Sequence, residues 1–366
     1  MIKNTDTLSP YQIAMIVIMT LIGVGIFSLP SQLAETAGTD AWFIIILGGL
    51  VSLVFINIII ALGNRFPGRT LPEYIEKILG KFFGKIIIIA YIVYFIIFMA
   101  YEIRVFNEIA KMFLLFRTPS EVIIIGLILA CTYAVRGGVE CIGRTMELFF
   151  PLLFFPLILI ILPGLAHIDK SNIFPVFYRL PPKIIASLPR TALSFAGYEV
   201  LLFYAGFSSH PKKNHRNATL SIIFITAIYG IITVLCFLMF GEKYLKVNIW
   251  PLLAYVKAID LPGLFIERLD GIMLSIWILT VFTTMISLYY IVTYSLSKLF
   301  KTKEQKQFAL PLVPLIYYIS LLPENIGQLD RLSNIMFHYI SSIMIFIIPS
   351  LLLLMAKVRK LRGDSP

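Results

Sequence analysis

Charged residues are scarce in this sequence of 366 residues. Asp, Glu, Lys and Arg make up 14% of it, whereas a soluble domain carries about 25%. Hydrophobic residues make up 59%, and the mean hydropathy is +0.90. The apolar runs at 43–62 and 150–166 are too long for a water-soluble core. The composition therefore excludes a soluble protein and indicates one that crosses a membrane several times.

Other features are missing as well, and each absence narrows the function. The sequence has no nucleophile elbow, nucleotide fingerprint or cluster of metal ligands, so we expect neither an enzyme nor a resident metal. Lys3 and Asp6 lead directly into a full-length apolar run, which does not fit a cleavable signal peptide. Cys131, Cys141 and Cys236 show no metal-binding or paired spacing, so we expect three free thiols.

Ten apolar segments are candidate membrane spans. Their expected bounds are 10–34, 41–62, 86–113, 119–135, 146–166, 184–207, 219–240, 264–297, 307–322 and 334–356. No interval between them holds a soluble domain, so we expect one transmembrane domain over residues 1–366. The net charge of +11 lies in short loops, which excludes nucleic acid as the partner and instead indicates sidedness in a lipid bilayer. Most of the 31 Lys and Arg residues lie inside if both termini, including a basic tail at 357–366, are cytoplasmic.

The loop at 66–85 is amphipathic. Its apolar residues recur at helical spacing among charges, which predicts a short helix along the inner face of the membrane. A polar connector without regular structure is the alternative.

The first span contains residues that a membrane helix tolerates poorly at its centre. The stretch LIGVGIFSLPSQLAETAG at 21–38 carries Gly23, Gly25 and Pro30. The sixth span carries Ser194, Gly197 and Glu199 at its middle. Two interruptions at matching positions of five plus five spans predict an inverted repeat, with one unit at about 10–166 and the other at about 184–356. Ordinary glycine packing between helices is the competing explanation.

Interrupted spans expose backbone groups near the middle of the membrane. Free N–H groups at one half-helix attract an anion, and free carbonyl groups at the other attract a cation. The pair of breaks therefore predicts a site for a zwitterion such as an amino acid.

The sequence resembles a known family at these residues. The stretch GVGIFSLP resembles the Gly-x-Gly-Ile motif of the amino acid–polyamine–organocation transporter superfamily. The stretches at 101–119, 194–203, 249–271 and 277–285 resemble the B subunit of endospore germinant receptors, the spore-permease branch of that superfamily. The resemblance implies an all-α membrane protein with ten transmembrane helices, a 5+5 inverted repeat of the LeuT type and broken helices 1 and 6.

The resemblance also implies a function. Such a B subunit senses a small nutrient, often an amino acid, together with an A subunit and a lipoprotein C subunit in the inner membrane of the spore. An ion-coupled amino acid permease and a scaffold for the other subunits are the alternatives. Some superfamily members couple to protons through a lysine in span five, and span five here has none.

The candidate ligand-binding residues lie in four spans. They are Gly23, Val24, Gly25, Tyr94, Phe195, Ala196, Gly197, Tyr198, Glu199, Thr283 and Thr284. A carboxylate in a span needs a partner, so Glu199 is either a functional group or an anchor bonded to the backbone of span one. The resemblance implies a sodium site at Thr283 and Thr284 with carbonyls of span one, against the alternative that each threonine bonds its own helix.

We expect structural roles for most of the other polar residues in or near the spans. Glu102, Arg104 and Glu108 are expected to form a stabilising charge cluster or a subunit contact near the outer surface. His338 is expected to be hydrogen-bonded packing, and Glu147 is expected at the inner interface. At the outer end, Glu267, Arg268 and Asp270 fit either a salt-bridge network or a gate.

Overall fold

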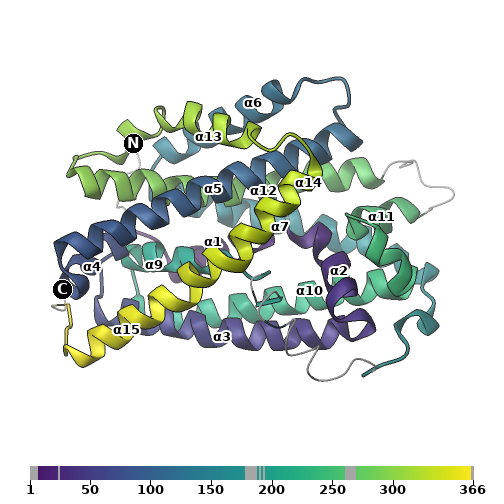
Figure 1. Cartoon of the computed structure of the whole chain (residues 1–366), viewed down its shortest axis with the longest axis horizontal. Coiled ribbons are helices and arrows are strands. Elements are labelled where there is room, and N and C mark those ends of the chain that lie inside the picture. Colours follow the sequence, from purple (N-terminus) through teal and green to yellow (C-terminus); the bar gives the residue numbers. More distant parts are fainter. Residues whose placement is uncertain are drawn as a thin grey trace.

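The computed structural model describes residues 7–23, 25–177, 188, 191–192, 194–259 and 269–363, without the side chains of 269, 270 and 338. Within these residues the fold is helical (Figure 1). The first half holds α1 (Pro10–Ile22), α2 (Gly25–Thr36), α3 (Ala41–Arg65), α4 (Leu71–Leu79), α5 (Lys81–Phe113), α6 (Ser120–Arg136) and α7 (Val139–Ile161). The second half holds α9 (Leu201–Tyr204), α10 (Pro211–Val247), α11 (Pro251–Ala258), α12 (Leu269–Phe300), α13 (Leu312–Leu321), α14 (Ile326–Ile335) and α15 (Ile348–Val358).

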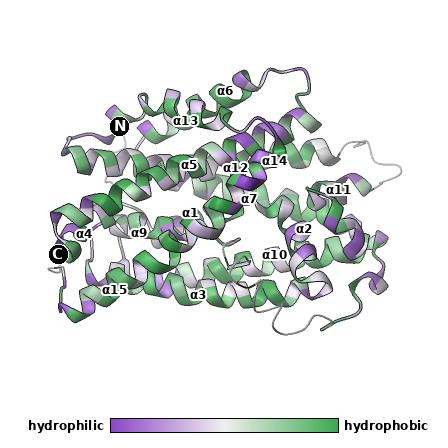
Figure 2. Ribbon diagram, in the orientation of Figure 1, coloured by the Kyte–Doolittle hydropathy of each residue, from purple (hydrophilic) through white to green (hydrophobic). Residues whose placement is uncertain are grey.

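Helix occupies each of the ten expected spans. By length and composition, five helices of the described chain could cross a membrane: α3, α5, α7, α10 and α12, counted with adjoining turns. The bent pair α1–α2 makes a sixth span, with 55° between its parts. Shorter apolar helices occupy Tyr198–Phe207, Leu312–Leu321 and Ile343–Val358, and α6 has 17 residues. Figure 2 shows hydrophobic residues along the long helices and hydrophilic residues mostly at their ends and in the loops.

Several boundaries differ from the expected ones. Span seven begins at Pro211 rather than at 219, and helix continues past a kink at Gly241 (φ 72°) to Val247. Span ten begins at Ile326 rather than at 334 and contains π-helical turns at Met336–Ile340 and Ile343–Ile347. The residues added at the start of each helix are mostly polar, so a prediction based on hydropathy did not include them.

The helices of the two halves correspond in length and order. The long helices α5 and α12 have 33 and 32 residues, and each precedes a short span. The small helices α4 and α11 stand before them in the same places. Counterparts also pack together, α3 against α10 and α5 against α12. These features match the predicted five-plus-five repeat.

Both termini lie at the same end of the molecule (Figure 1), as an even number of spans requires. The Leu8 amide donates to the Phe207 carbonyl at 2.7 Å, which holds the N-terminal segment to the end of span six. The Gly363 amide donates to the Arg65 carbonyl at 2.7 Å, which holds the C-terminal segment to the end of α3. Which side of the membrane this end faces stays a prediction.

The amphipathic loop forms the expected helix, α4. Leu71, Tyr74 and Ile75 are buried against the bundle. Glu73 accepts hydrogen bonds from the Thr70 amide at 2.9 Å and from the Lys298 ammonium group at 2.6 Å. Partial burial alone would raise the pKa of the Glu73 carboxyl, but these hydrogen bonds and the charge of Lys298 outweigh it and lower the pKa. The carboxylate thus caps α4 and joins it to α12.

Candidate functional site

Span one is broken between α1 and α2. Gly23 has φ 29°, a backbone conformation that side chains other than glycine rarely adopt. Val24, predicted to contribute to the site, lies outside the described residues. The end of α1 leaves carbonyl groups without helical partners, and these must be satisfied inside a membrane.

Side chains of two other helices satisfy these carbonyls. The hydroxyl of Thr284 in α12 donates to the Met19 carbonyl at 3.1 Å. The hydroxyl of Tyr229 in α10 donates to the Leu21 carbonyl at 2.6 Å. The indole nitrogen of Trp277 in α12 donates to the Gly23 carbonyl at 3.3 Å. Side chains of α10 and α12 therefore stabilise the break in span one.

Span six is interrupted beside this break. Residues 194–197 form turns, and helix resumes at Tyr198. Gly197 has φ 127°, and a Cβ added there would lie 3.0 Å from the Thr20 carbonyl oxygen of α1. The two interrupted spans thus touch through their backbones, and only glycine allows this approach.

Glu199 joins three spans. Its carboxylate accepts a hydrogen bond from the Gly197 amide at 2.7 Å and another from the Tyr94 hydroxyl of α5 at 2.8 Å. The hydroxyl of Ser341 in span ten donates to the Tyr94 oxygen at 3.2 Å. Of the two roles considered for Glu199, these contacts fit the anchor, and the described partners belong to spans three and six rather than to span one. Because the backbone at Gly197 is not helical, the Gly197 amide can donate to the Glu199 carboxylate.

Thr283 and Thr284 are fully buried and make different contacts. Thr283 donates to the Thr280 carbonyl of its own helix at 2.8 Å, which is the alternative weighed from the sequence. Thr284 reaches span one, where its hydroxyl donates to the Met19 carbonyl, and a sodium ion at these groups stays a prediction. Adjacent residues on a helix point about 100° apart, so only one of them faces α1.

A cavity opens at the break in span one. It occupies about 800 Å³, counted with the part open to solvent. Three predicted site residues, Gly23, Gly25 and Ala196, line it. The other lining residues come mainly from α1, α2, α5 and span ten: Thr20, Leu21, Ser28, Leu29, Gln32, Phe98, Tyr101, Glu102, Ser194, Tyr229, Asp330, Ser333, Asn334 and Phe337. The remaining predicted site residues that the structure describes are not among the residues that line the cavity.

Glu102 is the lining residue that sequence reasoning assigned elsewhere. It is 3% exposed, and its carboxylate oxygens lie 3.0 and 3.3 Å from where a Cβ on Gly23 would be. The sequence suggested a charge cluster or a subunit contact for Glu102; the structure places its side chain on the cavity wall, while Arg104 pairs with Glu108. The spacing of Tyr94, Phe98 and Glu102, four residues apart, places all three on one face of α5. This spacing is the feature of the sequence that could have grouped Glu102 with the predicted site residue Tyr94.

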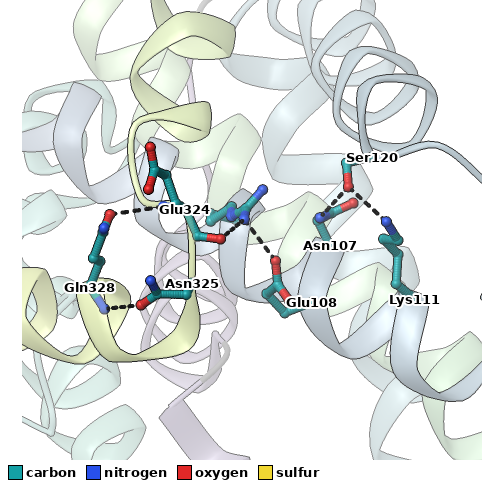
Figure 3. A network of polar contacts seen from close by, with 8 residues as sticks. Asn107, Glu108, Lys111, Ser120, Glu324, Asn325 and Gln328 are labelled. Atoms are coloured by element: carbon teal, nitrogen blue, oxygen red, sulfur yellow. Dashed lines mark hydrogen bonds and ion pairs between the residues drawn. The ribbon is translucent and has the colours of Figure 1, made fainter.

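Arg104 and Glu108 form the expected ion pair at 2.9 Å, within a wider network (Figure 3). Arg104 also donates to the Glu324 carbonyl at 3.5 Å, just before α14. There the Glu324 amide donates to Gln328 at 2.9 Å, and the Gln328 amide donates to the Asn325 side chain at 2.9 Å. The network connects α5 to the start of α14, whose residues line the cavity.

The other polar residues singled out from the sequence are only partly described. Glu147 accepts a hydrogen bond from the Gln12 side chain at 3.1 Å, which joins α7 to α1. Glu267 and Arg268 lie outside the described residues, as do the side chains of Asp270 and His338.

Comparison with known proteins identifies the protein family. The spore permease family, described as "Spore germination protein", matches residues 7–329. Spore germination protein YndE of Bacillus subtilis is 30% identical over 366 residues and all of both chains. Spore germination protein A2 of the same organism is 28% identical over 96% of each chain.

A solved structure shares the fold. The crystal structure of MhsT in complex with L-phenylalanine aligns with a TM-score of 0.69 and 13% identity, over 94% of this chain and 88% of MhsT. The protein thus has the LeuT-type transporter fold with ten spans in two inverted repeats, as the sequence predicted. The resemblance to germinant-receptor proteins is confirmed, and the chain belongs to the spore permease family of spore germination proteins.

Proposed function

We propose that this protein is the nutrient-sensing subunit of a spore germinant receptor. It binds a small molecule, such as an amino acid, in the cavity between the broken spans one and six. The observation that carries the proposal is the cavity itself, which Gly23, Gly25 and Ala196 line at the two interruptions. MhsT, which has a similar fold, was solved in complex with L-phenylalanine, and this supports an amino acid as the ligand. The role is binding rather than catalysis.

Signalling follows from a shift between conformations. A ligand in the cavity contacts α2 and α5 on one side and α14 on the other. Any arrangement of α14 that improves these contacts gains population when the ligand binds. The link from Arg104 to the Glu324 carbonyl transmits a displacement of α14 to the outer part of α5. Partner A and C subunits in the spore inner membrane read this change, with both termini of the present chain in the cytoplasm.

A permease with alternating access is the second candidate, and the transporter fold favours it. The test uses the purified chain in liposomes with a panel of radiolabelled amino acids and sugars. Bound and internalised label are measured in the same preparation. Saturable binding without accumulation is expected of a sensor. Accumulation that follows a sodium or proton gradient would contradict the sensor and establish the permease.

A sodium ion at Thr284 is part of the permease alternative and is tested separately. We expect Thr284→Val to lower thermal stability, because the buried Met19 carbonyl loses its donor, at a cost of about 1–3 kcal/mol. Thr283→Val is the matched control and should cost less, because its hydroxyl bonds only its own helix. Melting temperatures in sodium and in potassium chloride provide the measurement. A sodium-dependent stabilisation that Thr284→Val abolishes would support an ion at this position, and one that survives in this variant would exclude it.

A further inference from the structure

Two short segments far apart in the sequence carry basic residues at the end of the molecule where both termini lie. Residues 77–85 and 357–362 contain lysine and arginine and no Asp or Glu. All of their basic side chains are exposed, and we call this set the basic corner: Lys77, Lys81, Lys85, Lys357, Arg359, Lys360 and Arg362. Within the part of the chain that the structure describes, none of them is ion-paired, so the corner has an uncompensated positive charge.

Hydrogen bonds hold the two segments of the basic corner together. The Arg359 guanidinium group donates to the Ile78 carbonyl at the end of α4, at 2.8 Å. The Arg65 guanidinium group donates to the Ala356 carbonyl of α15 at 3.3 Å, and the Gly363 amide donates back to the Arg65 carbonyl at 2.7 Å. Figure 1 shows the end of α15 beside α4. The basic residues of the tail therefore belong to a fixed surface rather than to a loose terminus.

Exposed apolar side chains run along both spans up to these basic residues. They are Phe82, Phe83, Ile86, Ile89 and Val93 on α5 and Leu351, Leu354 and Val358 on α15. The helix α5 has 33 residues and rises about 50 Å, whereas the hydrocarbon core of a bilayer is about 30 Å thick. Phe82 and Phe83, 72% and 62% exposed, follow Lys81 directly, and aromatic side chains favour the membrane–water interface. The basic corner therefore stands at the level of the lipid headgroups.

We propose that the basic corner binds the headgroup of an anionic phospholipid, whose acyl chains lie along the exposed apolar faces of α5 and α15. Lysine and arginine are the side chains that bind phosphate, and the guanidinium group of Arg359 keeps further donors besides the one that meets Ile78. Lys85 lies one turn further into the span, and its long side chain reaches back to the headgroups. The continuous apolar surface on both spans favours a lipid over an acidic protein segment. The basic corner shares no residue with the cavity lining, so this site is separate from the proposed nutrient site.

Lipid binding to the purified full-length chain in neutral detergent tests this proposal by native mass spectrometry. The probes are phosphatidylglycerol and phosphatidylcholine with identical acyl chains. We expect phosphatidylglycerol to bind about tenfold or more tightly, because the choline group cancels the phosphate charge. A variant with both Lys77→Gln and Lys81→Gln should lose about tenfold or more of the phosphatidylglycerol affinity and keep that for phosphatidylcholine, because each basic residue near an anionic headgroup contributes about fivefold.

The matched control removes the same charge outside the basic corner. A variant with both Lys303→Gln and Lys306→Gln changes two exposed lysines of the loop after α12 and should alter phosphatidylglycerol affinity by less than about twofold. All four lysines are exposed, so both double variants should fold normally. Equal affinities for the two phospholipids would overturn the proposal and favour an acidic partner protein at the basic corner. Equal weakening by the two double variants would also overturn it, because net charge rather than this surface would then attract the lipid.

Discussion

Gly25→Leu is expected to abolish the nutrient response while the protein stays folded in the membrane. Gly25 lines the cavity at the start of α2, and a Cβ added there would meet nothing within 4 Å. Its φ lies outside the left-handed region, so a side chain causes no backbone strain. The leucine side chain therefore extends into open space and occupies the volume that the ligand needs.

Germination of spores that carry Gly25→Leu gives the measurement, with protein level determined by immunoblot. Gly25→Ala is the matched control, because a single methyl group leaves most of the cavity open. We expect a response that is lost in the leucine variant and retained in the alanine variant. Ala196→Trp should act like Gly25→Leu, because Ala196 also lines the cavity. A normal response in Gly25→Leu spores would show that the nutrient binds elsewhere.

Gly197→Ala should have the largest effect on stability. The backbone at Gly197 has φ 127°, which an alanine adopts only at a cost of about 1–3 kcal/mol. The new Cβ would also lie 3.0 Å from the Thr20 carbonyl oxygen and 3.3 Å from the Leu21 nitrogen, both backbone atoms of α1. Relief of this clash separates the two broken spans, so the total cost should reach about 3 kcal/mol or more.

Thermal unfolding of the purified chain measures this loss, and Gly230→Ala serves as the control. Gly230 lies within α10, and a Cβ added there meets nothing within 4 Å. Alanine is also the better helix former, so Gly230→Ala should leave the melting temperature unchanged or raise it. Equal melting behaviour of the two variants would contradict the close contact between spans one and six.

The sequence predicted the fold well because its signals are local. Apolar runs mark membrane spans, and the glycines at 23 and 197 mark the breaks, since few other residues accept their conformations. Equal lengths of matching spans then indicated the repeat. Helix ends were less predictable where a helix continues into polar residues, as in α10 and α14.

The site was predictable only in part, because its side chains are brought together by packing. The backbone positions Gly23, Gly25 and Ala196 line the cavity as expected. Glu102 and Asp330 were missed as cavity residues, since they belong to spans three and ten and reach the break only through the packing of whole helices. The sequence gives the spacing within each span but not the angle at which two spans meet.

Protection of an engineered cysteine tests the central claim, that the nutrient occupies the cavity at the break. Ser333→Cys places a thiol on the cavity wall, in a chain whose partly exposed Cys141 is replaced by alanine. The probe is the compound that binds saturably in the liposome measurements. Thr118→Cys, in a loop outside the cavity, is the control. The cavity site predicts that the bound compound slows alkylation at position 333 and not at position 118. Equal alkylation rates at position 333 with and without the compound would contradict it.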